Sequence, residues 1–165
     1  MAKTTNVENS ESNVEKKQYL TFKVGKEIYG LRLNQAKEII KPPKITTVPN
    51  TEDYILGVIN LRGQVVPVIN LKNKLGLTED TTVDINQDKS KKIVVINING
   101  MLIGVYVDGV NEVINISVED IEGVTENRTG IREEFIKGVS TYGDYLIIVL
   151  DLDNLLFENK EEKGA

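Results

Sequence analysis

The chain has 165 residues, of which 40% are hydrophobic and 27% are charged, and its formal net charge at pH 7 is −5. It contains no His, Cys or Trp, which excludes Ser-His-Asp and Cys-His nucleophile systems, Cys/His zinc sites and disulfides within the chain. The acidic balance disfavours a nucleic-acid partner, and no apolar run approaches the roughly 18–20 residues that span a bilayer. We therefore expect a cytoplasmic protein that does not insert into membranes, binds no cofactor and is not an enzyme.

Four β-hairpins are predicted between two polar ends. Residues 1–18 hold few apolar side chains and predict a disordered arm, and residues 158–165 predict a flexible tail for the same reason. Between them, β-branched and apolar residues recur in short bursts broken by Gly, Asn and Pro, which is typical of short strands joined by tight turns. The paired segments are 19–24 with 28–33, 57–61 with 65–71, 91–98 with 102–107, and 139–142 with 145–152.

Other residues indicate the ends and positions of the elements. Pro67 cannot donate a ladder hydrogen bond, so its strand is expected at a sheet edge or with a bulge. Residues 78–90 are polar and predict a connector. Three short helices are also predicted, over residues 71–77, 117–121 and 152–157. Asp151 or Asp153 is the expected N-cap of the last of them.

The sequence contains an internal repeat. A shift of 74 places residues 20–40 on residues 94–114, and every apolar position of the first segment then meets an apolar partner. The aligned glycines are Gly30 with Gly104 and, at a shift of 81, Gly57 with Gly138. Alternation of polar and apolar residues alone does not align glycines in order, so we interpret the pattern as a duplication.

The repeat predicts an all-β protein made of two small barrels. Each copy supplies about five short strands, enough for one closed or nearly closed barrel. A copy of about 60–70 residues holds little core of its own, so the two are expected to pack together. They would form one domain over residues 19–157, with subdomains at about 19–77 and 91–157. Whether strands are exchanged between the barrels is left open by the pattern.

Arg62 and two repeat-related glutamates are the candidates for binding chemistry. Arg62 lies at the tip of an otherwise apolar hairpin, where its planar cation can pair with a carboxylate and its stem can cover apolar surface. A plain solvent-facing turn arginine is equally compatible with the sequence. Glu38 and Glu112 lie in apolar surroundings, where a strand needs one solvent-facing residue in any case, which favours a structural role. No glycine-rich phosphate loop occurs in the sequence.

A set of ordered strings extends over most of the chain, from about residue 19 to residue 157. The most specific is Gly57-Val58-Ile59-Asn60-Leu61-Arg62-Gly63, followed by Pro67-Val68. The others include Tyr29-Gly30-Leu31, Lys37-Glu38-Ile39-Ile40, Val48-Pro49-Asn50-Thr51 and Val107-Asp108-Gly109-Val110. With these strings the chain resembles the CheW family of bacterial chemotaxis coupling proteins.

This resemblance implies a fold and a function. Members of the family consist of two SH3-like five-stranded β-barrels and act as non-catalytic adaptors. They couple the cytoplasmic tip of chemoreceptors to the regulatory domain of the histidine kinase CheA, so this chain is expected to bind both partners at membrane-anchored receptor arrays. An apolar groove between the barrels would take the helical hairpin of the receptor tip.

The resemblance also implies two sets of site residues. The expected receptor-binding residues are Ala36, Glu38, Gly57, Val58, Arg62 and Val113. Gly57 would let a helix approach closely because it has no Cβ, Arg62 would pair with receptor carboxylates, and Glu38 would pair with a receptor cation or with Arg62 itself. The expected kinase-binding residues are Asn111, Glu112, Ile114, Ile121 and Val124.

Two other interpretations stay open at this point. One is a CheW-like regulatory domain of the kinase or of a response-regulator fusion. The other is a carboxylate-dependent enzyme on a β-barrel scaffold. A phosphotransfer assay distinguishes an adaptor from an enzyme, because an adaptor is inert with ATP alone but changes the output of the kinase.

Overall fold

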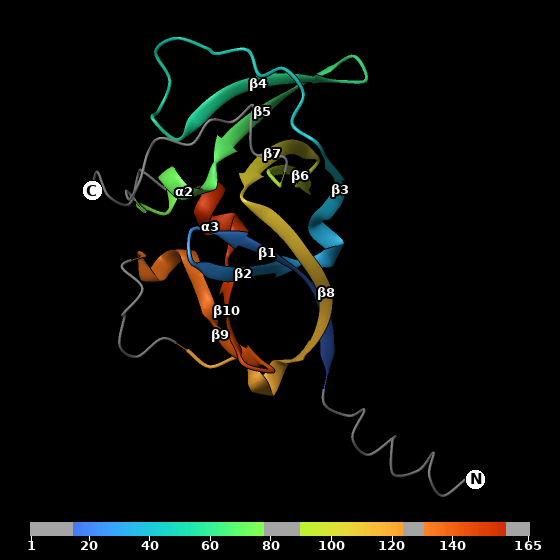
Figure 1. Cartoon of the computed structure of the whole chain (residues 1–165), viewed down its shortest axis with the longest axis vertical. Coiled ribbons are helices and arrows are strands. Elements are labelled where there is room, and N and C mark those ends of the chain that lie inside the picture. Colours follow the sequence, from blue (N-terminus) through green and yellow to red (C-terminus); the bar gives the residue numbers. More distant parts are fainter. Residues whose placement is uncertain (1–14, 78–89, 124–130, 158–165) are drawn as a thin grey trace, which may run out of the picture.

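The computed structural model describes residues 15–77, 90–123 and 131–157, which form short strands and shorter helices (Figure 1). The strands are β1 (Lys16–Val24), β2 (Glu27–Arg32), β3 (Ala36–Ile40), β4 (Ile55–Leu61), β5 (Gln64–Asn70), β6 (Lys92–Ile98), β7 (Met101–Val107), β8 (Gly109–Ser117), β9 (Ile136–Tyr142) and β10 (Tyr145–Leu150). The helices are η1 (Leu33–Gln35), α2 (Leu71–Lys74), η2 (Val118–Asp120), η3 (Glu133–Phe135) and α3 (Leu152–Leu156).

The strands form two sheets that exchange hairpins between the two copies of the repeat. Sheet A has the strand order β8-β1-β2-β10-β9, and sheet B has the order β3-β6-β7-β5-β4. The β1–β2 hairpin therefore completes the sheet of the second copy, and the β6–β7 hairpin completes the sheet of the first. Strands β4 and β5 lie at one end of the molecule and β9 and β10 at the other (Figure 1). The predicted all-β fold with two five-stranded SH3-like subdomains is confirmed.

The strand registers repeat residue by residue. In sheet B, β5 pairs in parallel with β7, with Val68 opposite Gly104. In sheet A, β10 pairs in parallel with β2, with Val149 opposite Gly30. These pairs are related by the shifts of 81 and 74 seen in the sequence. The β3–β6 and β8–β1 ladders also carry an irregularity at the same repeat position, so the two sheets share one architecture down to their bulges.

All four predicted hairpins are present. Of the two alternatives expected for the Pro67 strand, the sheet edge is wrong, whereas the β4–β5 ladder does carry an irregularity beside it, between Ile55 and Gly57. Strand β5 lies inside sheet B, between β4 and β7. Val58, opposite Pro67, bonds through its own N–H and C=O to Thr46, at 2.8 and 2.9 Å. Pro67 is therefore at a non-hydrogen-bonded position toward β4. On its other side, β5 pairs with β7 only from Val68 onward. The backbone N–H that proline lacks is therefore not needed for the β5–β7 ladder.

Apolar residues on both faces of the inner strands pack into three clusters. In β6, Ile93 and Val95 join a cluster inside sheet B, whereas Val94 and Ile96 join a larger shared core between the two sheets. A third cluster lies inside sheet A and includes Val149. Strands that are apolar on both faces thus fill the contact between the two sheets with buried side chains. An apolar groove along the surface of this junction stays a prediction.

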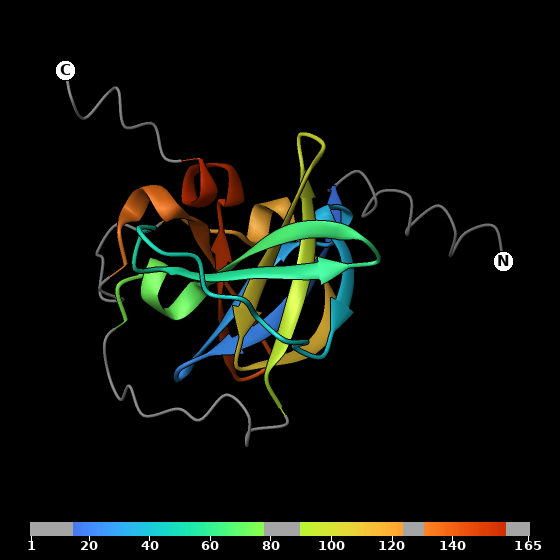
Figure 2. The same ribbon diagram turned by 90° about the horizontal axis from the view of Figure 1, so that it is seen from above.

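Neither sheet closes through a continuous ladder between its edge strands within the described residues. Thr46, in the connection after β3, forms a bridge with Val58 of the edge strand β4, and Glu122, after β8, forms a bridge with Val139 of β9. Seen from above, the β4–β5 hairpin and the β3–β4 connection lie across the rest of the molecule (Figure 2). The connections therefore cover the edges that an open sheet would expose.

The ends of the elements differ from the prediction in two respects. β1 begins at Lys16, inside the predicted arm, because Lys16 pairs with Ser117 of β8. The three predicted helices are present but shorter, and the Asp151 side chain caps α3 by accepting from the Asn154 N–H at 3.1 Å. Residues 1–14, 78–89 and 158–165, which hold most of the predicted arm, connector and tail, lie outside the described residues. Among the described helices, none has the length and apolar character to cross a bilayer.

Candidate protein-binding surface

Arg62 has a backbone conformation that is unfavourable for an arginine. It is the first of two residues that link β4 to β5, with a φ of 50°, and Gly63 follows with a φ of 87°. The Gly63 N–H donates to Oδ1 of Asn60 at 2.7 Å. At the β6–β7 tip the same conformation is taken by Asn99-Gly100, with φ of 55° and 83°, the residue pair that such turns prefer. An arginine in the left-handed region departs from this preference, which points to a use for its side chain.

The Arg62 side chain forms an ion pair with Glu38 across the open side of sheet B. Glu38 lies on β3, and β3 and β4 are the opposite edges of this sheet, so the pair joins the two edges. Arg62 Nη2 contacts Glu38 Oε2, and Nη1 lies 3.4 Å from Oε1, which is a bidentate arrangement. The arginine side chain is 66% exposed and that of the glutamate 27%. The cation is therefore oriented but still accessible.

The contact between Arg62 and Glu38 shifts the pKa values of both groups. The hydrogen bond from Arg62 holds the pKa of the Glu38 carboxyl below its ordinary value. Burial acts against it, and the positive charges of Arg62 and Lys37 add to the lowering. The same hydrogen bond and charge raise the pKa of Arg62. Of the two partners expected for Glu38, the structure has Arg62. Both groups are thus charged at neutral pH.

Gly57 lets two segments of this chain approach each other. It is buried, with a φ of 148°, and a Cβ built on it would collide with the Thr46 carbonyl, whose carbon would lie only 2.7 Å away. The reason that the sequence suggested for Gly57, close approach of a receptor helix, is therefore wrong, because the β3–β4 connection occupies that space. Gly138 repeats the arrangement, since a Cβ added there would lie 2.6 Å from the Glu122 carbonyl oxygen.

The other expected receptor-binding residues lie on three different strands. Ala36, on β3, is half-buried and packs against the shared core. Val58, on β4, is half-buried and bridged to Thr46. Val113 belongs to sheet A, on β8, and is 45% exposed. Figure 1 shows β3 and β8 along the same flank of the molecule, so the expected set is spread over one side.

The expected kinase-binding residues divide into exposed and buried ones. Asn111 and Glu112 are exposed on β8. Ile114 is buried in the cluster inside sheet A, and the half-buried Ile121 packs against that cluster. The assignment of Ile114 is therefore wrong, because its side chain fills the barrel interior and cannot reach a partner. Val124 lies outside the described residues.

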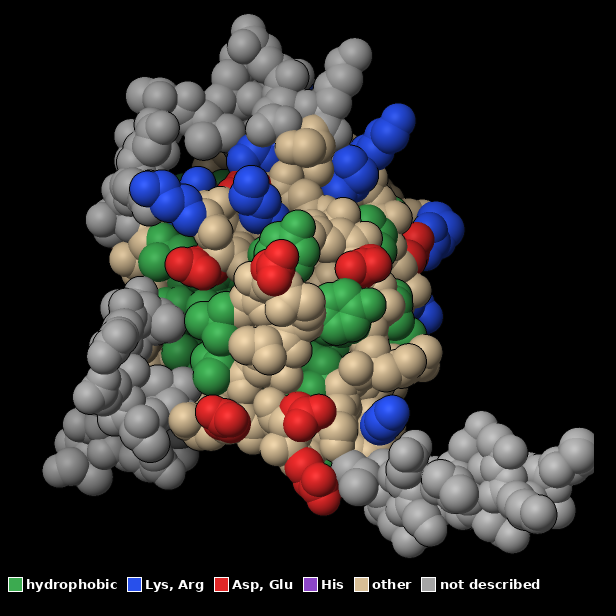
Figure 3. Space-filling view, turned by 60° about the horizontal axis from the view of Figure 1, so that its bottom comes forward, with side chains coloured by type: hydrophobic (Ala, Val, Ile, Leu, Met, Phe, Trp, Pro, Cys, Tyr) green, Lys and Arg blue, Asp and Glu red, His purple; other side chains and the backbone are tan. Residues whose placement is uncertain are grey.

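Several exposed apolar side chains were not predicted from the sequence. On the β9–β10 hairpin, Tyr142, Tyr145 and Leu146 are 44%, 58% and 44% exposed, and Val65, three residues after Arg62, is 67% exposed. Figure 3 views the molecule from the lower end of Figure 1, where β9 and β10 lie, and hydrophobic side chains gather across this face among scattered acidic ones. Alternation along a strand predicts which residues share a face but not which face the fold leaves uncovered.

The arrangement offers means of binding a protein surface. Within residues 15–77, 90–123 and 131–157, no three or more Asp and Glu side chains are grouped to hold a metal ion. What the described surface presents is an oriented ion pair, edge strands and exposed aromatic and aliphatic side chains, which are typical of protein interfaces. Fold and surface together define a protein-binding module built from two duplicated barrels.

Comparisons with known proteins identify the family. A family model described as "CheW-like domain" matches residues 18–160. The chain is similar to chemotaxis protein CheW of Treponema pallidum, with 34% identity over 90% of this chain and 86% of that protein, and to chemotaxis protein CheW of Helicobacter pylori, with 34% identity over 88% and 85%. The crystal structure of scaffolding protein TtCheW from Thermoanaerobacter tengcongensis matches with a TM-score of 0.74 and 34% identity, covering 84% of this chain and 86% of that one. The chain belongs to the CheW family of non-catalytic chemotaxis scaffolds.

Proposed function

We propose that this chain couples the cytoplasmic tip of chemoreceptors to the histidine kinase CheA and so permits receptor control of kinase activity. It would act in the cytoplasm, recruited to membrane-anchored receptor arrays. Membership of the CheW family supports a role in chemotaxis signalling. The single observation that carries the receptor side of the proposal is Arg62, an exposed cation kept in a disfavoured left-handed turn and oriented by Glu38.

The receptor-binding surface in this proposal is the outer side of sheet B around Arg62. The guanidinium carries five N–H donors, and its two contacts with Glu38 leave others free to meet carboxylates on a receptor helix. Ala36 and Val58 offer small half-buried apolar contacts on the neighbouring strands, and Val113 adds an exposed one on β8. A receptor helix that meets all of these residues would lie along this side of the molecule, against the edge strands β3, β4 and β8.

The kinase-binding surface in this proposal belongs to sheet A. Asn111 and Glu112 are exposed on its edge strand β8, and the apolar side chains of the β9–β10 hairpin add area that can be buried. The two surfaces thus meet on β8, where Val113 belongs to the receptor side and Asn111 and Glu112 belong to the kinase side. A single interface below about 1,200 Å² is at the weak end of protein complexes. Many such contacts linked in one array would gain strength through effective concentration.

The variant Arg62→Asn tests the receptor side without disturbing the fold. Asparagine suits the left-handed turn, as Asn99 does at the β6–β7 tip, so the variant should fold normally while losing the cation. We expect receptor binding to weaken about tenfold or more, as for loss of an interface arginine, and receptor control of CheA in a reconstituted array to be lost. Binding of CheA alone should persist.

The matched control is Lys26→Asn, which removes an exposed cation from the β1–β2 turn. It should leave receptor control intact. Full receptor control of the kinase by Arg62→Asn, measured as autophosphorylation with and without attractant, would show that Arg62 does not contact the receptor.

A further inference from the structure

A buried lysine in the second copy is neutralised by a carboxylate of the same chain. Lys91 precedes β6, its side chain is only 5% exposed, and its Nζ contacts Oδ1 of Asp108, between β7 and β8. The Gly25 N–H donates to the other carboxylate oxygen at 2.6 Å, and Lys72 Nζ lies 3.8 Å from it. Burial raises the pKa of Asp108, but the hydrogen bonds from Lys91 and Gly25 and the charges of Lys91 and Lys72 outweigh it and hold the pKa below its ordinary value.

The first copy keeps the lysine but lacks the carboxylate. The shift of 74 that relates the copies places Lys17 at the position of Lys91 and Asn34 at that of Asp108. The strand registers agree, because Lys92 pairs with Val107 in one hairpin and Tyr19 pairs with Arg32 in the other. In the second copy the lysine contacts the aspartate directly after the ladder, whereas in the first copy the ladder ends at Arg32 and Asn34 lies in the short helix η1 that follows.

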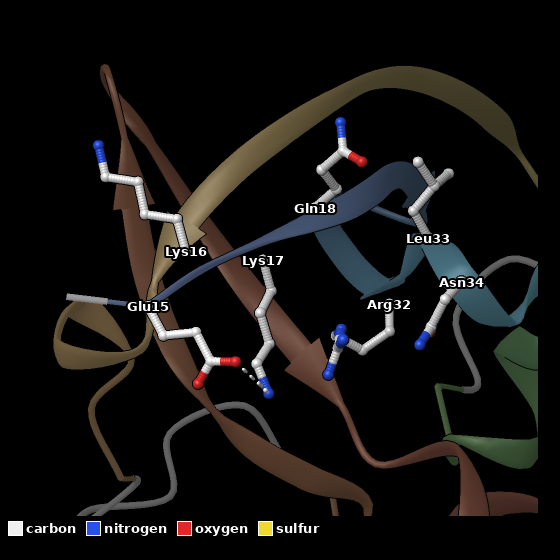
Figure 4. A pocket seen from close by; sticks show the side chains of 7 residues that line it. All are labelled: Glu15, Lys16, Lys17, Gln18, Arg32, Leu33 and Asn34. Atoms are coloured by element: carbon white, nitrogen blue, oxygen red, sulfur yellow. Dashed lines mark ion pairs between the residues drawn. The ribbon is translucent and has the colours of Figure 1, made fainter. Parts of the chain in front are cut away.

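A pocket lies at this position in the first copy. Its volume is about 590 Å³, and its lining residues are Glu15, Lys16, Lys17, Gln18, Arg32, Leu33 and Asn34. Figure 4 shows the side chains of Lys17, Arg32 and Asn34 directed toward the same space, whereas those of Lys16 and Gln18 point away from it.

One buried donor at the pocket has no acceptor. The Nε–H of Arg32 is buried and has no hydrogen-bond partner, which is a costly arrangement unless an acceptor enters. Lys17 lies 3.8 Å from the carboxylate of Glu15, whose side chain is 69% exposed, so this contact is a loose one. Two cations and one amide donor thus face a single weakly held carboxylate.

We propose that this pocket binds a small molecule through an oxyanion, a carboxylate or phosphate group, held between Lys17 and Arg32. The group would occupy the place that the Asp108 carboxylate takes in the second copy, accepting from Arg32 Nη, from Lys17 Nζ and from the Asn34 amide, and a small movement of the Arg32 side chain would bring its Nε–H within reach as well. A planar guanidinium beside an ammonium suits both kinds of oxyanion. The site is separate from the Arg62–Glu38 surface and does not depend on the proposed function.

Titration of the full chain with sodium phosphate and, separately, with sodium succinate tests the site, with sodium chloride at matched ionic strength as the reference. We expect saturable shifts of the backbone amide NMR signals of Gln18, Arg32 and Asn34 with one or both oxyanions. A response to only one of them supports the site and identifies the group it takes. Shifts that are absent, or that sodium chloride reproduces, overturn the proposal.

Three variants make the test specific. Lys17→Gln should weaken binding about tenfold, as expected for one charge-assisted hydrogen bond. Asn34→Asp should abolish it, because an internal carboxylate would then fill the site as Asp108 does. Lys23→Gln removes an exposed lysine of the same strand outside the pocket and should change nothing. If Asn34→Asp does not fold, Lys17→Gln decides alone, and an affinity equal to that of the unaltered chain contradicts the proposal.

Discussion

Arg62 and Glu38 depend on each other although 24 residues separate them in the sequence. The arginine holds the carboxylate in its charged form, and the carboxylate holds the guanidinium in one orientation at the hairpin tip. An oriented cation loses less conformational entropy when a partner binds than a freely rotating one. Both residues and their pairing could be predicted as candidates from the sequence, but only the curvature of sheet B brings its two edges together.

The titration of Glu38 measures this mutual dependence. Because the pKa of Glu38 is lowered in the folded protein, the stabilisation from the pair is fully present above the ordinary glutamate pKa and is lost as the pH falls through the lowered value. In Arg62→Asn the carboxyl should titrate at higher pH than in the unaltered chain. Carboxyl ¹³C NMR of both proteins gives the two curves.

Asp108 provides the internal control for that measurement, since Lys91 and Gly25 hold its pKa below the ordinary value and Arg62 takes no part. Its titration should be the same in both proteins. An unchanged Glu38 curve in Arg62→Asn would mean that the ion pair does not form in solution.

At the scale of elements, β4 and the connection before it form a unit that closes sheet B. Gly57 is the residue on which this closure depends, because Thr46 passes over it at a distance that no Cβ allows. The β4–β5 hairpin was predicted correctly, since a hairpin is a local pattern. The role of Gly57 and the edge position of the Pro67 strand were predicted wrongly, because they depend on neighbours outside the hairpin, Thr46 and β7.

The variant Gly57→Ala should destabilise the protein by about 2–4 kcal/mol, because it combines a strained backbone with a collision against a carbonyl group. Chemical denaturation measures the free energy of unfolding. The matched control is Gly143→Ala in the β9–β10 turn, where φ is 64° but the space around a Cβ is open. That change should cost only about 1 kcal/mol. Equal losses for the two variants would contradict the closure of sheet B over Gly57.

At the scale of the whole molecule, hairpin exchange joins the two barrels into one body. Each sheet contains strands from both halves of the chain, and the shared core fills the seam between them. The apolar runs of β6 and β10 carry a signal for this filled seam, because consecutive residues such as Ile93 and Val94 face different clusters. Nothing local in a hairpin determines which of two similar sheets it completes, so the exchange itself could not be predicted.

Divergence between the copies gives the two barrels different surfaces on one architecture. The position of Arg62 in the first copy is held by Gly143 in the second, and the position of Asp108 in the second is held by Asn34 in the first. A duplicated protein whose halves have diverged in this way can present mainly one sheet to one partner and mainly the other sheet to another. This division of surfaces is the central claim of the proposed coupling role.

Capture of a receptor-tip fragment on the immobilised regulatory domain of CheA tests that claim most directly. We predict that the fragment is retained when this chain is added and not without it, that Arg62→Asn still binds the kinase domain but no longer retains the fragment, and that Lys26→Asn behaves like the unaltered chain. Retention of the fragment by Arg62→Asn at the level of the unaltered chain, or equal retention when no chain is added, would contradict the division of surfaces.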